Sequence, residues 1–189
     1  VFDDADIARA VEGIAIAGFF NAGQDCTAAT RVMVHEKVHD DFVAAMREYI
    51  KGNVATGVPT DEEILFGPVN NVNQFDRVMG ILSDLPTNAN IETGGVRQGD
   101  KGFFIEPTVF GDVANSMTIA REEIFGPVAA VIPFDTVEEA LELGNATEYG
   151  LGSGVWSTNV NTIFKMVHGL QAGTVWVNCY GMLDPAVGF

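Results

Sequence analysis

Apolar residues along this chain follow two patterns, one with the period of a helix and one made of short continuous runs. The helical pattern is clear where Val38, Phe42, Met46 and Tyr49 share one face, with Ala45 beside them. Short apolar runs bounded by polar residues or glycine are typical of buried strands. The two patterns predict helices over residues 5–19, 38–49, 72–82, 137–144 and 160–167, and strands over residues 31–34, 129–134, 153–157 and 174–178.

Two of these helices carry sequence signals at their start. Asp3 and Asp4 precede the first helix, and an aspartate side chain there can accept a hydrogen bond from a free helical N–H. Thr136 and Glu139 have the spacing of a capping box, in which each side chain bonds backbone near the other. Because strands and helices alternate throughout, we expect the strands to pair in parallel through right-handed crossovers.

The composition agrees with a single folded domain over residues 1–189. Hydrophobic residues make up 47% of the chain and charged residues 19%, which allows a sizeable core and disfavours disorder. No apolar stretch approaches the roughly 20 residues that a membrane helix needs, and no signal peptide is visible. Because the chain starts at Val1 rather than at a methionine, we interpret it as processed or cut from a longer protein.

The formal net charge of −16 excludes proteins that bind nucleic acids or anionic membranes through clustered Lys and Arg. The 10 basic residues are scattered and form no stripe. Cys26 and Cys179 provide no disulfide framework, so we expect a reducing compartment and place the protein in the cytoplasm.

The strongest chemical signal is a single cysteine, Cys26, which follows a glycine-containing turn and precedes a run of small residues. Such a turn can present a thiol at the start of a helix, where free N–H groups and the helix dipole favour an anion. A thiolate there is a good nucleophile at neutral pH, and the same N–H groups could hold an oxyanion formed at an attacked carbonyl. The segment therefore predicts a nucleophilic thiol.

Five stretches, in collinear order, resemble motifs of the aldehyde dehydrogenase family. The nucleophile segment of that family carries Gly-Gln-x-Cys, and this chain has Gly23-Gln24-Asp25-Cys26. The family's cofactor-ribose motif resembles Glu122-Glu123-Ile124-Phe125-Gly126-Pro127-Val128. The remaining matches are Pro107-Thr108-Val109, Asn145-Ala146-Thr147-Glu148-Tyr149-Gly150-Leu151 and Gly173-Thr174-Val175-Trp176-Val177-Asn178.

The resemblance implies an α/β fold with a three-layer open sheet that is mostly parallel and has helices on both faces. It identifies residues 1–189 as the catalytic domain that carries the thiol nucleophile. In the family, an NAD-binding Rossmann domain and the general-base glutamate precede this region, and both are absent from this chain. The oxyanion asparagine and the lysine for the cofactor phosphate are absent too. We therefore expect the isolated chain to be inactive.

The same resemblance implies roles for individual residues. Cys26 corresponds to the nucleophile, and Glu123 and Phe125 correspond to residues that contact the nicotinamide-side ribose of NAD or NADP. Gln74, with Arg77 one helical turn later, matches positions that touch the cofactor in some members, although an exposed helix face explains this pair nearly as well. The positions implied to line the substrate site are Asn178, Tyr180 and Phe189, with a turn-capping role as the alternative for Asn178.

The implied activity is oxidation of an aldehyde to a carboxylic acid through a thiohemiacetal and a thioester on Cys26, with hydride transfer to NAD or NADP. The wording around Cys26 is similar to aminoaldehyde and betaine-aldehyde types. An acidic protein suits a cationic substrate, to which Asp25 and Asp184 could contribute. The resemblance also implies that the parent protein is a homodimer or homotetramer, with an aldehyde as its small-molecule partner.

Two other interpretations remain open. His35, Glu36 and His39 match the H-E-x-x-H pattern of zinc hydrolases, which requires both histidines on one face of one helix. His35 directly follows a strand-like run, so we expect it to lie outside the helix and expect no metal at this pattern. The second alternative is a non-catalytic domain in which Cys26 is merely a buried side chain.

Overall fold

Helices and strands alternate along the chain, as the hydrophobic pattern predicts. The structure is a computed structural model that describes residues 1–84, 89–186 and 188. Its elements, in chain order, are α1 (Ile7–Phe19), the 3-10 turn η1 (Phe20–Gly23), β1 (Arg31–His35), α2 (Glu36–Asn53), α3 (Val72–Ser83), β2 (Asn90–Thr93), β3 (Thr108–Gly111), α4 (Thr118–Arg121), β4 (Val128–Phe134), α5 (Val137–Asn145), β5 (Gly152–Val155), α6 (Val160–Gly169) and β6 (Thr174–Val177).

The strands form a larger and a smaller sheet. The larger has the order β1-β4-β3-β2, in which β4 is parallel to both β1 and β3, whereas β2 is antiparallel to β3. β5 and β6 form a parallel pair. Residues 1–2 run between the two sheets. The Val1 nitrogen donates to the Met33 carbonyl at 2.7 Å, and the Phe2 nitrogen donates to the Trp156 carbonyl at 3.0 Å. The first residues therefore join β1 to the end of β5.

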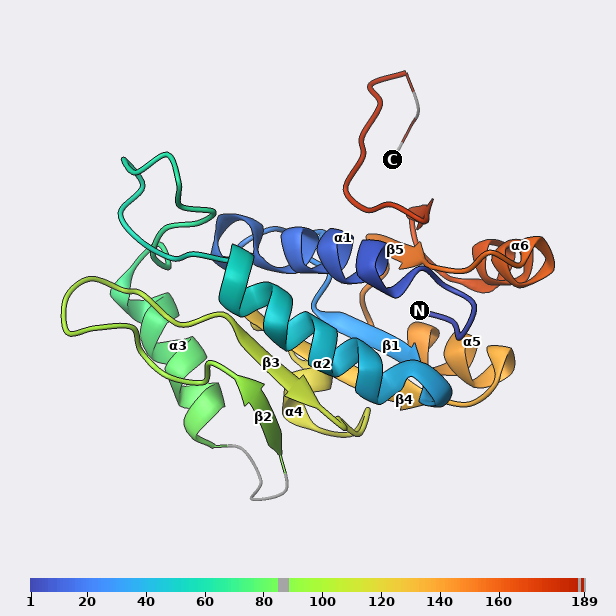
Figure 1. Cartoon of the computed structure of the whole chain (residues 1–189), viewed down its shortest axis with the longest axis horizontal. Helices are drawn as coiled ribbons and strands as arrows, with labels where there is room; N and C mark the ends of the chain where they lie inside the picture. Colours follow the sequence, from blue (N-terminus) through green and yellow to red (C-terminus); the bar gives the residue numbers. More distant parts are fainter. Residues whose placement is uncertain (85–88, 187, 189) are drawn as a thin grey trace.

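Strand β4 shows why helices cover both faces of the larger sheet. Ala129 and Val131 belong to a core shared with α1 and α2, whereas Val128, Ala130 and Ile132 belong to a second core shared with α3 and α4. Successive side chains of a strand point to opposite faces, so a strand this apolar needs cover on both. Figure 1 shows α1 and α2 in front of the sheet. The predicted three-layer, mostly parallel α/β fold is confirmed.

The two predicted helix starts have different outcomes. The Thr136 cap is confirmed, because Thr136 Oγ1 accepts a hydrogen bond from the Glu139 nitrogen at 3.2 Å. The reciprocal bond of the capping box is shifted by one residue, since the Glu139 carboxylate accepts from the Asp135 nitrogen, at 2.7 Å, and not from that of Thr136. The prediction that Asp3 and Asp4 cap the first helix is wrong. The helix begins later, at Ile7, and the side chain of Asp6 caps it. The Asp4 carboxylate instead binds the loop at residues 157–159.

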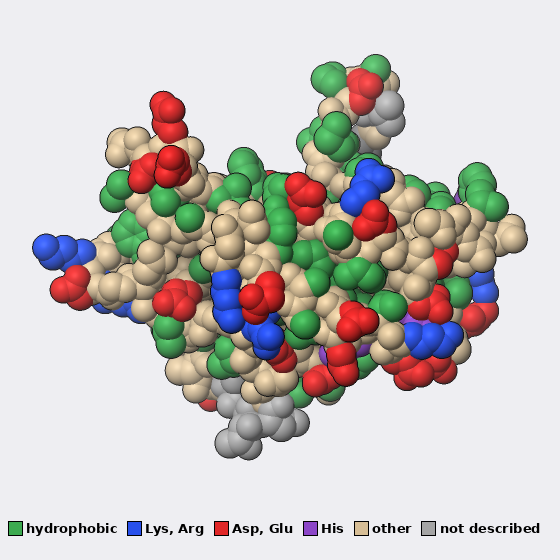
Figure 2. All heavy atoms as spheres, viewed as in Figure 1, with side chains coloured by type: hydrophobic (Ala, Val, Ile, Leu, Met, Phe, Trp, Pro, Cys, Tyr) green, Lys and Arg blue, Asp and Glu red, His purple; other side chains and the backbone are tan. Residues whose placement is uncertain are grey.

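Acidic side chains outnumber basic ones at the surface. Figure 2 shows Asp and Glu side chains spread over the visible face, with Lys and Arg in a few separate places, in keeping with the net charge of −16. Among the helices of the described residues, none combines the length and the apolar character that crossing a membrane requires.

Candidate active site

Cys26 lies in an exposed turn between η1 and β1. The prediction that it starts a helix is wrong, because the chain passes from this turn directly into β1. The hydrogen bonds of Asp25 close a turn at this point of the chain. Its carboxylate accepts from the Thr27 nitrogen at 2.6 Å, and its carbonyl accepts from the Ala28 nitrogen at 3.1 Å. Within the described residues, no acceptor is paired with the Cys26 N–H. A free amide therefore adjoins the thiol, but no helix dipole does.

The turn before the cysteine is held in an unusual backbone conformation. Asn21, Ala22 and Gly23 have φ values of 52°, 57° and 68°, in the left-handed region. The Asn21 amide donates to the Gln24 carbonyl at 2.9 Å, and the Gln24 amide donates back to the Asn21 carbonyl at 3.2 Å. The Gln24 side-chain oxygen also accepts from the Asn70 nitrogen at 3.0 Å. These bonds fix the direction in which the chain approaches Cys26.

Gly23 brings the cysteine turn against the predicted cofactor segment. A Cβ atom built on Gly23 would lie 2.1 Å from the Gly126 carbonyl oxygen, so only a glycine permits this approach. Gly126 directly follows Phe125 in the sequence, and Glu123 lies two residues before Phe125. The structure therefore places the predicted nucleophile beside the residues predicted to contact the ribose.

Side chains of helix α3 hold the predicted cofactor segment, residues 123–125, by bonding the backbone of that segment. Arg77 donates to the carbonyl of Glu123 at 2.7 Å and to that of Ile124 at 2.6 Å. The Gln74 amide nitrogen donates to the carbonyls of Ile124 and Phe125, each at 2.9 Å. Both α3 side chains thus position the segment, a role that neither sequence interpretation anticipated. A direct contact between Gln74 and the cofactor stays a prediction.

The two predicted ribose contacts are free to bind a ligand. The side chain of Glu123 is exposed, and in the described part of the chain it has no hydrogen-bond or ion-pair partner. Phe125 has a φ of 54° and remains 37% exposed despite its apolar ring. A carboxylate and an aromatic face held on a braced backbone suit a sugar, whose hydroxyls donate to carboxylates and whose ring packs on aromatic surfaces.

One cavity connects these groups. It has a volume of about 270 Å³, and its lining includes Asp25, Cys26, Thr27, Glu123, Phe125 and Tyr180. The predicted nucleophile, both predicted ribose contacts and one predicted substrate residue therefore share a single hollow. An exposed thiol beside a cavity also argues against the alternative in which Cys26 is a buried core side chain.

Tyr180 forms part of the cavity wall. Its ring packs on that of Trp176, with centroids 4.6 Å apart. Burial, reinforced by the negative charge of Asp25, raises the pKa of Tyr180 to about 12. The phenol is therefore neutral at physiological pH and can both donate and accept hydrogen bonds at the cavity.

The other two predicted substrate residues are placed differently. Asn178 is not among the residues that line this cavity, and both ends of its amide bind Ser157, whose nitrogen donates to it at 3.0 Å and whose carbonyl accepts from it at 2.9 Å. This is the turn-capping role that the sequence left open, and a substrate contact for Asn178 stays a prediction. Phe189 lies outside the described residues.

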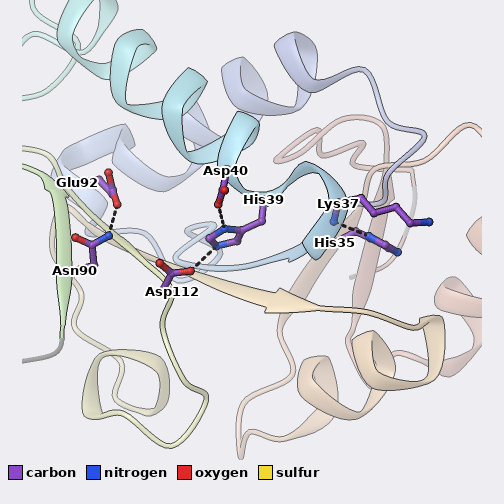
Figure 3. Close-up of polar contacts among 7 residues, drawn as sticks. All are labelled: His35, Lys37, His39, Asp40, Asn90, Glu92 and Asp112. Carbon is purple, nitrogen blue, oxygen red and sulfur yellow. Dashed lines mark hydrogen bonds and ion pairs between the residues drawn. The ribbon is translucent and has the colours of Figure 1, made fainter.

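The two histidines of the zinc-hydrolase pattern diverge, as Figure 3 shows. His35 ends β1, and its Nδ1 accepts from the Lys37 nitrogen at 3.2 Å, whereas His39 lies inside α2. The His39 ring instead faces Asp40, 3.2 Å from Nδ1, and Asp112, 3.7 Å from Nε2. The expectation that His35 lies outside the helix is confirmed. Within residues 1–84, 89–186 and 188, no group of three or more His, Cys, Asp or Glu side chains could hold a metal ion.

Comparison with known proteins agrees with this geometry. The sequence profile of the aldehyde dehydrogenase family matches residues 1–189. Aldehyde dehydrogenase family 2 member B4, mitochondrial, from Arabidopsis thaliana is 46% identical over 190 residues, which cover 100% of this chain and 35% of that protein. The chain thus spans about a third of the length of this relative.

Solved structures of aldehyde dehydrogenases are also similar to this chain. The NAD+ complex of an aldehyde dehydrogenase from Bacillus cereus superposes with a TM-score of 0.93 at 40% identity, covering 98% of this chain and 38% of that one. Betaine aldehyde dehydrogenase from Staphylococcus aureus in complex with NAD+ superposes with a TM-score of 0.94 at 33% identity, covering 98% of this chain and 38% of that one. The chain belongs to the aldehyde dehydrogenase family.

Proposed function

We propose that residues 1–189 are the thiol-bearing catalytic domain of an enzyme that oxidises an aldehyde to a carboxylic acid with NAD or NADP. The observation that carries this proposal is the cavity shared by Cys26, Glu123 and Phe125. In this cavity a candidate nucleophile lies near two side chains that suit a ribose. The Bacillus and Staphylococcus relatives, both described as NAD+ complexes, support the choice of cofactor.

Cys26 acts as the nucleophile. Its thiolate forms a C–S bond with the aldehyde carbon, and the carbonyl electron pair moves to the oxygen, which becomes an oxyanion. The Cys26 N–H, which has no other acceptor among the described residues, donates a hydrogen bond to that oxygen. Removal of hydride from this carbon leaves a thioester on the sulfur, and water then releases the acid and restores the thiol.

Glu123 and Phe125 hold the cofactor next to the thiol. With NAD(P)+ bound, the Glu123 carboxylate would accept hydrogen bonds from the ribose hydroxyls, and the Phe125 ring would pack on the sugar or nicotinamide side; both side chains line the cavity. NAD(P)+, when bound, supplies the hydride acceptor. Arg77 and Gln74 keep both side chains in place by bonding the backbone that carries them.

We also propose that residues 1–189 do not turn over aldehyde alone. The chain spans 35% of its Arabidopsis relative, and the family resemblance assigns the general base and most cofactor contacts to segments outside it. The purified chain should therefore give no steady NADH production, whereas the full-length gene product that contains it should. Steady turnover by residues 1–189 would contradict this. We further propose that the full-length protein forms dimers or tetramers and that it is located in the cytoplasm.

Covalent trapping tests the chemistry directly. The full-length protein is mixed with an aldehyde and NAD+, quenched in acid within milliseconds to seconds, and digested for mass spectrometry. We expect an acyl group on the peptide that contains Cys26 and none on the peptide that contains Cys179. An acylated residue other than Cys26, or product formation without any acylated peptide, would contradict the proposal.

A further inference from the structure

Asp25 presents a fixed negative charge at the wall of the catalytic cavity. It is half-buried, and it lines the same cavity as Cys26. One carboxylate oxygen, Oδ1, accepts from the Thr27 nitrogen at 2.6 Å and from the Thr27 hydroxyl at 2.7 Å. These bonds fix the orientation of the carboxylate. Among the described residues, the second oxygen has no hydrogen-bond partner.

The charge of Asp25 is not neutralised by a neighbouring cation. Arg31 and Arg121 also line the cavity, but no ion pair joins either of them to Asp25 within the described residues. The guanidinium of Arg31 is turned to other partners, the Asn115 side chain at 2.8 Å and the Leu143 carbonyl at 3.0 Å. Tyr180 cannot neutralise the carboxylate, because a phenol is either neutral or negatively charged. The cavity beside the thiol thus keeps an unpaired carboxylate.

We infer that Asp25 is a specificity-determining residue that selects short aldehydes carrying a protonated amine at the far end. This inference rests on the proposed function, because it concerns the substrate of the same site. Asp25 and Cys26 are consecutive and line one cavity, so the carboxylate and the sulfur lie within the combined reach of two neighbouring side chains, on the order of 10 Å or less. A substrate that bonds to Cys26 and pairs with Asp25 is therefore a short aldehyde, with roughly two to five carbons between the carbonyl carbon and the nitrogen. A half-buried carboxylate attracts such a cation more strongly than one in open solvent.

A matched pair of substrates tests this inference. 3-Aminopropanal and butanal have the same chain length and differ by an ammonium in place of a methyl group. In the full-length protein, kcat/KM should be higher for 3-aminopropanal, and 1 M NaCl should reduce this preference by screening. In Asp25→Asn, which keeps an oxygen to accept from Thr27, the ratio of the two kcat/KM values should fall about tenfold.

Two further variants separate charge from structure. Asp25→Glu keeps the charge, so the ratio should stay above that of Asp25→Asn. The sequence also suggested Asp184 as a contributor, but its exposed carboxylate does not line the cavity, so Asp184→Asn should leave the ratio as in the wild type. In addition, propylammonium should slow iodoacetamide labelling of Cys26 in the wild type and not in Asp25→Asn.

The outcomes distinguish the two proposals. If both aldehydes are oxidised and Asp25→Asn leaves the ratio unchanged, the inference about Asp25 is wrong while the proposed function stands. The same conclusion follows if the wild type prefers butanal, or if Asp184→Asn lowers the ratio as much as Asp25→Asn. If neither these aldehydes nor any other is oxidised, the proposed function is wrong, and the inference is wrong with it.

Discussion

At the scale of single residues, the chemistry depends on an exposed sulfur beside a free amide. In the full-length protein, Cys26→Ser should reduce NADH formation at least about a thousandfold, because a hydroxyl is far less ionised than a thiol at neutral pH. The measurement is steady-state NADH absorbance with a saturating aldehyde. Cys179→Ala is the matched control, since this half-buried thiol is not among the residues that line the cavity. Equal losses in both variants would mean that Cys26 is not the nucleophile.

Gly23 sets the contact between the cysteine turn and the cofactor segment. Gly23→Ala should destabilise the protein by about 3 kcal/mol or more, since its Cβ would lie 2.1 Å from the Gly126 carbonyl oxygen and its φ of 68° disfavours a side chain. Urea unfolding monitored by tryptophan fluorescence measures the change. Gly52→Ala, in α2, is the control: apart from its own turn of helix, no described atom lies within 4 Å of the added methyl group, and stability should rise by about 0.5–1 kcal/mol. Similar effects of the two substitutions would refute the close-contact argument.

At the scale of elements, α3 matters through the loop that it holds. Arg77→Leu removes the hydrogen bonds to the Glu123 and Ile124 carbonyls, which lets the Glu123–Phe125 segment move. We expect KM for NAD+ to rise about tenfold, with a smaller change in kcat, because two charge-assisted hydrogen bonds orient the binding side chains. Initial rates at varied NAD+ give both constants. Asp76→Asn, at an exposed position of the same helix, should change neither constant. A fall in kcat alone for Arg77→Leu would contradict this role.

Local signals explain which elements the sequence predicts. The start of α5 is marked by Thr136 and Glu139, which lie within four residues of each other. The continuous apolar run of β4 reflects burial on both faces of the strand. Both signals are local, so both elements can be predicted without knowing the fold. β3 spans only Thr108–Gly111, and α4 is a single turn, Thr118–Arg121; elements this short carry no period. The glycine-containing turn before Cys26 suggested that a helix starts there. The Asp25–Thr27 bond, together with pairing of the following strand to β4, decides otherwise.

Long-range contacts explain what the sequence does not predict at the site. The partners of Gln74 lie 50 and 51 residues away, so no local pattern shows that its amide binds the Ile124 and Phe125 carbonyls. The identity of Cys26, Glu123 and Phe125 as candidates came from motifs, and the structure adds that one cavity unites them. The sequence also does not predict the close approach of Gly23 to Gly126, because a glycine at position 23 indicates only a turn.

At the scale of the whole molecule, the segment at residues 1–4 ties the two sheets together. Val1 bonds the backbone of β1 at Met33, and Phe2 bonds the backbone at Trp156, just after β5. Asp4 adds bonds to the loop that follows Trp156. Its Oδ2 accepts from the nitrogens of Thr158 and Asn159, at 2.9 and 2.8 Å, and from two hydroxyls. One carboxylate therefore anchors the start of the chain to the loop between β5 and α6.

The titration of Asp4 makes this link testable. Burial by itself raises the pKa, but the hydrogen bonds from Thr158, Ser157 and Asn159 outweigh it and lower the pKa of Asp4 below its ordinary value. A lowered folded-state pKa means that the stabilisation is fully present above the unfolded value and is lost as pH falls through the folded one. The bond network should therefore contribute at neutral pH and fade in acid.

Asp4→Asn imitates the protonated side chain, so its cost should depend on pH. At about pH 7 the variant should lose about 1 kcal/mol of unfolding free energy, an amount limited by the exposure of Asp4. At about pH 3, below the ordinary aspartate pKa of 3.8, the difference should be smaller, because the stabilisation fades as pH falls toward the lowered folded-state pKa of Asp4. Urea unfolding at both pH values measures the two differences. Asp3→Asn is the control, since among the described residues the Asp3 side chain makes only an exposed ion pair with Lys37 at 3.2 Å, and the substitution should cost little at either pH. A penalty for Asp4→Asn that persists undiminished in acid would mean that the carboxylate charge does not hold the two sheets together.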